Sequence, residues 1–278
     1  MSDFVYLNGE FKRFSDAAIP LGDRAIYFGD GCYDVLLVRH GRVYQFEEHF
    51  TRLAGNCKRL MIPFNYDGRR MMSIIYRLCD ISCINDAVVY IQIGRRGGKR
   101  RHEIEEEYGA DVLVTVSDFT LGEPTPLSAI TVEDRRHLLC DIKTVNLLCS
   151  VLALREANEA GCECAIFLRD GVVTEESRSN VFLLNGGRLI THPTDRKILP
   201  GIMRANLIRL AGGLGMTVEE REFGLDELYS ADEVLVSSTT KFLRRIKTID
   251  GRRCKMSENE ICGRLYGGLV QDFLQKTE

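Results

Sequence analysis

The chain has 278 residues, of which 45% are hydrophobic and 28% are charged, and its formal net charge is −3. This balance is typical of a globular protein and excludes a largely disordered chain, and it lacks the basic excess that nucleic-acid binding requires. The length suits two domains or one large α/β unit. The first residues carry acids and a turn instead of the basic and apolar regions of a signal peptide, so we expect a cytoplasmic protein without membrane association.

The cysteines, ten in all, are scattered and mostly lie in apolar runs. The closest metal-like spacings are Cys79 to Cys83 and Cys162 to Cys164, and neither has a second pair or a nearby histidine. We therefore predict reduced, buried thiols and no metal site.

The N-terminal half is predicted to contain several strands and two helices. Asn8-Gly9 is a strong hairpin signal, and His40-Gly41 marks a second turn. Side-chain periodicity predicts strands at 4–7, 11–14, 33–38, 43–46, 87–93 and 111–117, and helices at 47–60 and 68–78.

Residues 119–127 contain Gly122, Pro124 and Pro126 and are predicted to be an interdomain linker. The expected organisation is an N-terminal α/β domain over 1–118 and a C-terminal α/β domain over 128–278. In the latter, the pattern predicts strands at 129–133, 164–168, 180–184, 233–237 and 242–249, and helices at 146–160, after Pro200-Gly201 and at the C-terminus. The hairpins favour a mixed α/β (α+β) fold over a doubly wound sheet.

Lys143 is the first candidate for chemistry. It lies among apolar residues, which disfavour the ammonium and favour the free amine that forms Schiff bases with aldehydes. A lysine at the start of an amphipathic helix more often places its charge in water, and the stretch alone favours that alternative. Glu175, in a polar segment after a predicted strand, would by itself indicate only a solvated turn.

Three separate segments change this balance: Phe-Gly-Asp-Gly-Cys-Tyr-Asp at 28–34, Asp-Ile-Lys-Thr-Val-Asn at 141–146 and Val-Thr-Glu-Glu-Ser-Arg-Ser-Asn at 173–180. Together and in this order they resemble the fold-type IV (class IV) pyridoxal-phosphate-dependent aminotransferases, and most of all the D-amino acid transaminases. The resemblance runs from about Phe4 to Gly251. It implies the two-domain fold-type IV architecture and a homodimer.

The resemblance also implies pyridoxal 5'-phosphate as the cofactor. Lys143 would form the Schiff base and carry the substrate proton, and Glu175 would pair with the pyridine nitrogen. Arg52 would bind the phosphate, together with backbone amides at a helix N-terminus and a hydroxyl-bearing loop at 237–240. The further cofactor-binding residues implied are Ser179, Asn180, Ile202, Met203 and Thr239.

For the substrate, Arg100 and His102 fall on the Arg-x-His pair with which D-amino acid transaminases bind the carboxylate, and Tyr33 and Thr240 would add hydroxyl groups. The alternative is a solvated basic loop, because five cations lie between positions 95 and 101. Arg178 stands where these enzymes commonly have serine, so it either binds a carboxylate itself or keeps Arg100 from doing so.

The expected reaction is ping-pong transfer of an amino group from a D-amino acid to a 2-oxo acid of the pyruvate or 2-oxoglutarate type. Met203, in place of a threonine, favours an aminodeoxychorismate lyase as one alternative. The Arg100 and His102 match disfavours a second, a transaminase of L-branched-chain amino acids or (R)-amines. A non-catalytic binding protein is disfavoured by Lys143 and Glu175. Extra cations such as Lys241 would favour dicarboxylate substrates.

Overall fold

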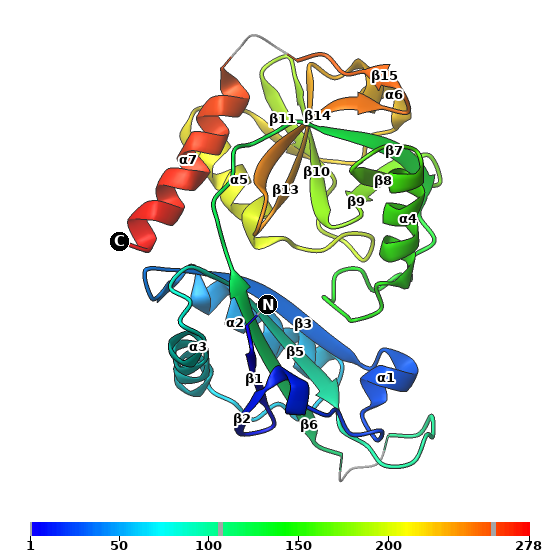
Figure 1. Ribbon diagram of the computed structural model, residues 1–278. Helices are drawn as coiled ribbons and strands as arrows, with labels where there is room; N and C mark the ends of the chain where they lie inside the picture. The colour runs from blue at the N-terminus through cyan, green and yellow to red at the C-terminus, as the bar shows by residue number, and fades with distance from the viewer. Residues whose placement is uncertain (1, 105–107, 257–259) are drawn as a thin grey trace. The chain divides into compact units, whose positions relative to one another are not determined.

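The computed structural model describes residues 2–104, 108–256 and 260–278 (Figure 1). The chain forms two compact units: the first comprises Met1–Leu121, Ile142–Asn146 and Phe273–Glu278, and the second comprises Gly122–Asp141 and Leu147–Asp272. The predicted division into 1–118 and 128–278 is wrong for two segments. The segment that carries Lys143 and the last six residues belong to the first unit, which no local sequence pattern indicates.

The first unit is built on an antiparallel six-stranded sheet in the order β2-β1-β6-β5-β3-β4. Its elements are β1 (Phe4–Leu7), β2 (Glu10–Arg13), a short 3-10 turn (Phe14–Asp16), α1 (Arg24–Phe28), β3 (Gly31–Arg39), β4 (Arg42–Val43), α2 (Phe46–Arg59), α3 (Gly68–Ser82), β5 (Ala87–Arg95) and β6 (Ala110–Asp118).

Alternation along the strands creates the core of this unit. Every second residue of β3, β5 and β6 is buried against apolar side chains of α2 and α3, because successive strand residues point to opposite faces. The predicted hairpin at Asn8-Gly9 is confirmed. The predicted strand over 43–46 is wrong beyond Val43, since Gln45 takes a left-handed conformation (φ 49°) and Phe46 begins α2.

The second unit contains a nine-stranded sheet along which the strands run in the order β12-β11-β10-β13-β14-β7-β8-β9. Because β9 also pairs with β10, this path closes on itself, and β15 pairs with β14. The elements are β7 (Leu127–Glu133), α4 (Leu148–Glu159), β8 (Cys164–Arg169), β9 (Val172–Glu176), β10 (Ser179–Asn185), β11 (Arg188–Thr191), α5 (Ile202–Gly213), β12 (Val218–Glu220), α6 (Leu225–Ser230), β13 (Glu233–Ser238), β14 (Phe242–Ile249), β15 (Arg252–Arg253) and α7 (Ile261–Lys276).

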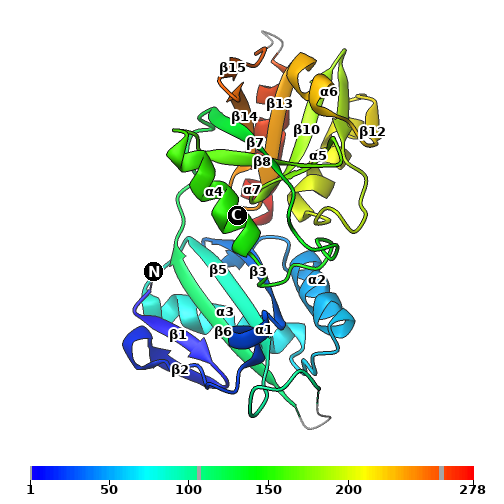
Figure 2. The ribbon, with the colours of Figure 1, turned by 90° about the vertical axis from the view of Figure 1, so that its right-hand side faces the viewer.

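The parallel strands β7 and β8 are connected through α4, which packs beside them (Figure 1 and Figure 2). The predicted long strands and helices of this half are present, with ends that shift by one or two residues. The hairpin predicted at Asn185-Gly186-Gly187 joins β10 to β11. The short elements β12, β15 and α6 are not predicted, because each has few residues and tertiary pairing decides its structure.

All ten cysteines are free thiols, and six of them are buried. Within the ranges that the structure describes, no helix combines the length and the apolar character that crossing a membrane requires.

A buried ion pair joins α2 to the sheet of the first unit. Asp34 on β3 is fully buried and accepts hydrogen bonds from Arg52 Nε at 2.8 Å and Arg52 Nη2 at 2.7 Å, and its Oδ1 lies 2.8 Å from His49 Nδ1. Burial raises the pKa of Asp34, but the charge of Arg52 and the contact with His49 outweigh it and hold this pKa well below the ordinary 3.8.

We expect Asp34→Asn to destabilise the protein by about 3–5 kcal/mol at neutral pH, because Arg52 loses its charged partner. Since the folded pKa of Asp34 is lowered, its stabilisation is complete above about pH 5 and is lost as the pH falls toward that pKa. Urea unfolding should therefore show a difference between wild type and variant that narrows on acidification. Asp3→Asn, at an exposed carboxylate, is the control. A difference that does not change with pH would contradict the prediction.

Candidate active site

Two backbone hydrogen bonds attach the lysine segment to the start of β3. Tyr33 N donates to Lys143 O at 2.9 Å, and Val145 N donates to Gly31 O at 3.1 Å. Between them Cys32 and Thr144 form an antiparallel bridge. The segment therefore acts as a short additional strand, and the predicted helix begins later, at Leu148.

Lys143 faces an aromatic hydroxyl. Its side chain is half-buried, its Nζ lies 3.3 Å from the hydroxyl of Tyr33, and the same nitrogen lies 4.3 Å from the centre of the Tyr33 ring. Backbone conformation and close packing explain why position 29, in the first motif, is a glycine. Gly29 ends α1 with φ 62°, and a Cβ there would lie 2.0 Å from Oδ1 of Asn146, which closes the lysine segment by donating to Gly29 O.

In the second unit, several candidate cofactor residues lie at one end of the neighbouring strands β9, β10 and β13. The strands β9 and β10 form a tight hairpin in which Glu175 lies opposite Asn180, and Asn180 in turn lies opposite Ser237 on β13. Cross-strand neighbours share a face, so these three side chains form one row. The turn between β13 and β14, which contains Thr239 and Thr240, lies at the same end of these strands.

Glu175 is buried and firmly held. Its Oε1 accepts from Asn180 Nδ2 at 3.0 Å and from the backbone N of Leu199 at 2.9 Å, while its Oε2 accepts from Arg136 Nη1. Arg136 also donates to both carboxylate oxygens of Asp134 at 2.9 Å. Arg136 is not among the residues that the sequence motifs predict for the site. The Asp-x-Arg spacing after β7 is the only local signal for it, and such spacing is common on surfaces.

The N-terminus of α5 lies at the same end of these strands, next to Asn180. Asn180 Nδ2 donates to Leu199 O at 2.9 Å, and a Cβ at Gly201 would lie 2.2 Å from Asn180 Oδ1. Gly201 is thus required by close packing. No side chain caps α5, whose first amides are those of Ile202 and Met203. The Met203 side chain is buried in the core, so it occupies a packing position.

Lys241 forms an ion pair with Glu176, which accounts for the cation at this position. Its Nζ lies 2.9 Å from Glu176 Oε2 and 3.1 Å from Ser179 Oγ, so it joins the turn after β13 to the β9-β10 hairpin. Glu176 is fully buried, and Lys241 supplies its charge partner. By contrast, Arg178 is exposed at the tip of the hairpin.

The basic stretch of the first unit is not uniformly solvated. Arg95 is buried and donates to Asp30 at 2.8 Å and to the carbonyls of Leu60 and Met61, while Arg96 pairs with Asp111. A surface loop is therefore the wrong interpretation for Arg95, whose burial comes from its position at the end of β5. Further along, Lys99, Arg100, Arg101 and His102 are exposed.

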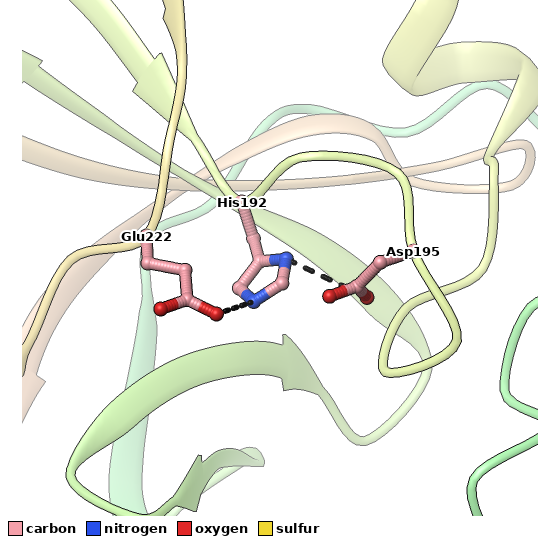
Figure 3. Close-up of side chains that lie close together, drawn as sticks. All are labelled: His192, Asp195 and Glu222. Atoms are coloured by element: carbon pink, nitrogen blue, oxygen red, sulfur yellow. Dashed lines mark ion pairs between the residues drawn. The ribbon is translucent and has the colours of Figure 1, made fainter.

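His192, Asp195 and Glu222 are the one set of metal-ligating side chains close enough for an ion within the described ranges (Figure 3). Asp195 lies 3.9 Å from Nδ1 of the buried His192, and Glu222 lies 3.8 Å from Nε2. The two carboxylates thus lie near different ring nitrogens, and Nδ1 also lies 2.8 Å from Pro193 O. Lys197 Nζ, 2.6 Å from Glu222 Oε1, already balances that carboxylate.

Comparison with known proteins adds independent information. The family model of Amino-transferase class IV matches residues 31–249. A D-alanine aminotransferase of Bacillus licheniformis is 35% identical over 255 residues, which cover 89% of this chain and 89% of that protein. A protein of the same name from Listeria monocytogenes serotype 4b is 31% identical over 282 residues, covering 98% and 96%.

Solved structures agree on the fold. A branched-chain aminotransferase from Thermoproteus uzoniensis, crystallised with norvaline, superposes with a TM-score of 0.89 at 24% identity and covers 100% of this chain and 97% of that one. A putative 4-amino-4-deoxychorismate lyase from Legionella pneumophila gives 0.84 at 22% identity, covering 93% and 97%. The expected fold-type IV architecture is thus confirmed, and the chain belongs to the class IV aminotransferases, which depend on pyridoxal phosphate.

Proposed function

We propose that this protein is a D-amino acid transaminase that transfers an amino group from a D-amino acid to a 2-oxo acid, with pyridoxal phosphate on Lys143. The placement of Lys143 carries the proposal, since backbone pairing holds this amine 3.3 Å from the Tyr33 hydroxyl. Relatives named D-alanine aminotransferase, similar over most of the chain, support the D-amino acid assignment.

Lys143 is proposed as the covalent anchor and the proton carrier. The cofactor, when bound, supplies an electron-withdrawing ring that stabilises negative charge at the substrate Cα. The amine of Lys143 takes the proton from that carbon, and the Tyr33 hydroxyl orients the amine through their contact.

Glu175 is proposed as the partner of the pyridine nitrogen. A buried carboxylate favours a proton on a nitrogen that it contacts, which strengthens the ring as an electron acceptor. Hydrogen bonds from Asn180, Leu199 and Arg136 fix the direction of this carboxylate. Arg136 is therefore proposed as a positioning residue that acts through Glu175.

The second unit offers groups that fit a phosphate. Ser237 Oγ is buried and has no hydrogen-bond partner among the described residues, and the amides of Ile202 and Met203 begin a helix without a side-chain cap. Unpaired donors of this kind favour an anion. We propose that they bind the phosphate together with Arg52, for which Asp34 fixes the guanidinium. The remaining proposed cofactor contacts are Ser179, Asn180 and Thr239.

Arg100, His102 and Tyr33 are proposed to bind the substrate carboxylate, because a guanidinium fork and neighbouring donors suit its two oxygens. Arg178 is exposed in a hairpin turn whose flanking residues are buried, three positions after Glu175, and we propose that it binds the second carboxylate of dicarboxylic substrates. Thr240 is the further residue proposed on the substrate side.

A homodimer is also proposed. Leu148, Val151 and Leu152 on α4 are 69%, 59% and 54% exposed, and their spacing places them on one helix face. An exposed apolar stripe of this kind favours burial against another protein surface, and a two-fold dimer can use the same stripe on both subunits.

We also infer a reducing compartment, the cytoplasm, since Cys32 and Cys57 lie 3.5 Å apart as free thiols.

We expect Lys143→Ala to lose the absorbance of lysine-bound pyridoxal phosphate and to lower turnover by at least about a thousandfold, because both the anchor and the proton carrier disappear. Absorption spectra and coupled assays with D-alanine, L-leucine, an (R)-amine and aminodeoxychorismate measure this. Lys58→Ala, at an exposed position on α2, should behave as wild type. Transamination retained without Lys143 would refute the mechanism, and pyruvate released from aminodeoxychorismate without an amino acceptor would identify a lyase.

Arg100→Leu should raise KM for D-alanine and D-glutamate alike, by roughly tenfold or more, because both carry the carboxylate that it is proposed to bind. Arg178→Ser should raise KM for D-glutamate and 2-oxoglutarate but not for D-alanine. Steady-state kinetics of both variants, with Lys99→Ala as the exposed control, decide the assignment. The opposite pattern would exchange the two arginines' roles.

Val151→Glu should shift the protein from dimer to monomer, because a dimer would then bury two unpaired carboxylates. Light scattering coupled to gel filtration measures the mass. Met256→Glu replaces another exposed apolar side chain, away from α4, and should leave the dimer intact. A wild-type protein that is monomeric and fully active would exclude the proposed assembly.

A further inference from the structure

Arg24 is buried, although it opens the short helix α1. Its guanidinium donates to three consecutive backbone carbonyls of a distant loop: Nη1 to Arg101 O at 2.5 Å and to Glu103 O at 3.3 Å, and Nη2 to His102 O at 3.2 Å. No helix or strand passes through these loop residues, so ladder hydrogen bonds do not hold them. A single side chain therefore binds the backbone of the loop.

Asp30 fixes the direction of Arg24. The Asp30 carboxylate accepts from Arg24 Nε at 2.9 Å and from Arg95 Nε at 2.8 Å. Burial raises the pKa of Asp30, but the hydrogen bonds from the two arginines outweigh it and lower the pKa. Arg95 is itself anchored on the carbonyls of Leu60 and Met61. Through this ionised carboxylate, Arg24 is tied to the core of the sheet.

Phe28 links the same group of residues to the exposed side chains of the loop. The Arg24 guanidinium lies 4.7 Å from the centre of the Phe28 ring, and that of Arg100 lies 5.2 Å from it. The imidazole of His102 lies 5.1 Å from the same ring, inclined by 53°. Arg100 and His102 thus contact the same ring, which Arg24 also contacts, and Arg24 binds the backbone carbonyls of residues 101–103.

The hydrogen bonds to the loop carbonyls and the contacts with the Phe28 ring act on different parts of the loop. The carbonyl bonds hold the backbone of residues 101–103, while the side chains of Arg100 and His102 are exposed. The loop carries three successive cations, Lys99, Arg100 and Arg101. Their mutual repulsion favours many loop conformations unless other contacts hold the backbone. A binding group held in one geometry loses less conformational entropy when substrate arrives.

We propose that Arg24 is a positioning residue for substrate binding: through the three loop carbonyls and Phe28 it orders Arg100 and His102 for the substrate carboxylate. This inference rests on the proposed transaminase function and adds a residue that does not itself touch substrate. Asp30 is the group through which the fold orients Arg24.

Arg24→Gln and Arg24→Lys separate charge from hydrogen bonding, because lysine retains a charge beside Asp30 but cannot donate to three carbonyls at once. Trypsin cleavage after residues 99, 100 and 101, followed by mass spectrometry, reports loop order without requiring activity. We expect clearly faster cleavage in both variants than in wild type. Arg96→Gln, which removes a nearby ion pair but no loop carbonyl contact, should cleave as wild type. Unchanged cleavage in a folded Arg24→Gln protein would overturn the proposal.

Kinetics provide the second measurement. Both Arg24 variants should raise KM for amino and oxo acids roughly tenfold while kcat changes little, and the spectrum of bound pyridoxal phosphate should stay as in wild type. Full recovery of KM by Arg24→Lys would reduce the role of Arg24 to charge balance and overturn the proposal. Phe28→Leu, which keeps an apolar side chain, should also raise KM and serves if the Arg24 variants fail to fold. A wild-type protein without cofactor spectrum or transamination would instead refute the proposed function.

Discussion

The backbone pairing between β3 and the lysine segment is the constraint on which the placement of Lys143 depends. Two hydrogen bonds, from Tyr33 N to Lys143 O and from Val145 N to Gly31 O, attach a segment that lies more than a hundred residues further along the chain. Since these bonds involve only backbone atoms, the side chains of Lys143 and Tyr33 remain available for chemistry. Gly29 completes the arrangement because its missing Cβ leaves room for Asn146.

Several buried or nearly buried charges in both units are paired with an opposite charge. Moving a charge out of water is costly, so each burial requires a partner, and the pair then specifies the relative position of the two elements. The same solution recurs in Arg52 with Asp34, Arg24 and Arg95 with Asp30, Arg136 with Asp134 and Glu175, and Lys241 with Glu176. Several of these pairs contact candidate site residues directly: Asp34 contacts Arg52, Arg136 contacts Glu175, and Lys241 contacts Ser179.

Local patterns predicted the long elements well and the supporting residues poorly. Alternation along β5 and β6 and helical spacing in α2 and α3 are properties of neighbouring residues, so they are visible in sequence. The sequence does not indicate the ion pairs of Arg95 and Lys241, because their carboxylate partners lie 65 residues away in sequence. Arg136 was not singled out for the same reason, since Glu175 is 39 residues distant.

The sequence alone determined the family and predicted which residues bind pyridoxal phosphate, among them Lys143, Glu175 and Arg52, because a motif made of neighbouring residues can be recognised without the fold. Tertiary structure alone decided that the lysine segment belongs to the first compact unit and that Glu175, Asn180 and Ser237 form one row. It also decided which cations are buried and which are exposed. The physical reason is that strand register and charge pairing join residues far apart in the chain, and local patterns carry no information about such partners.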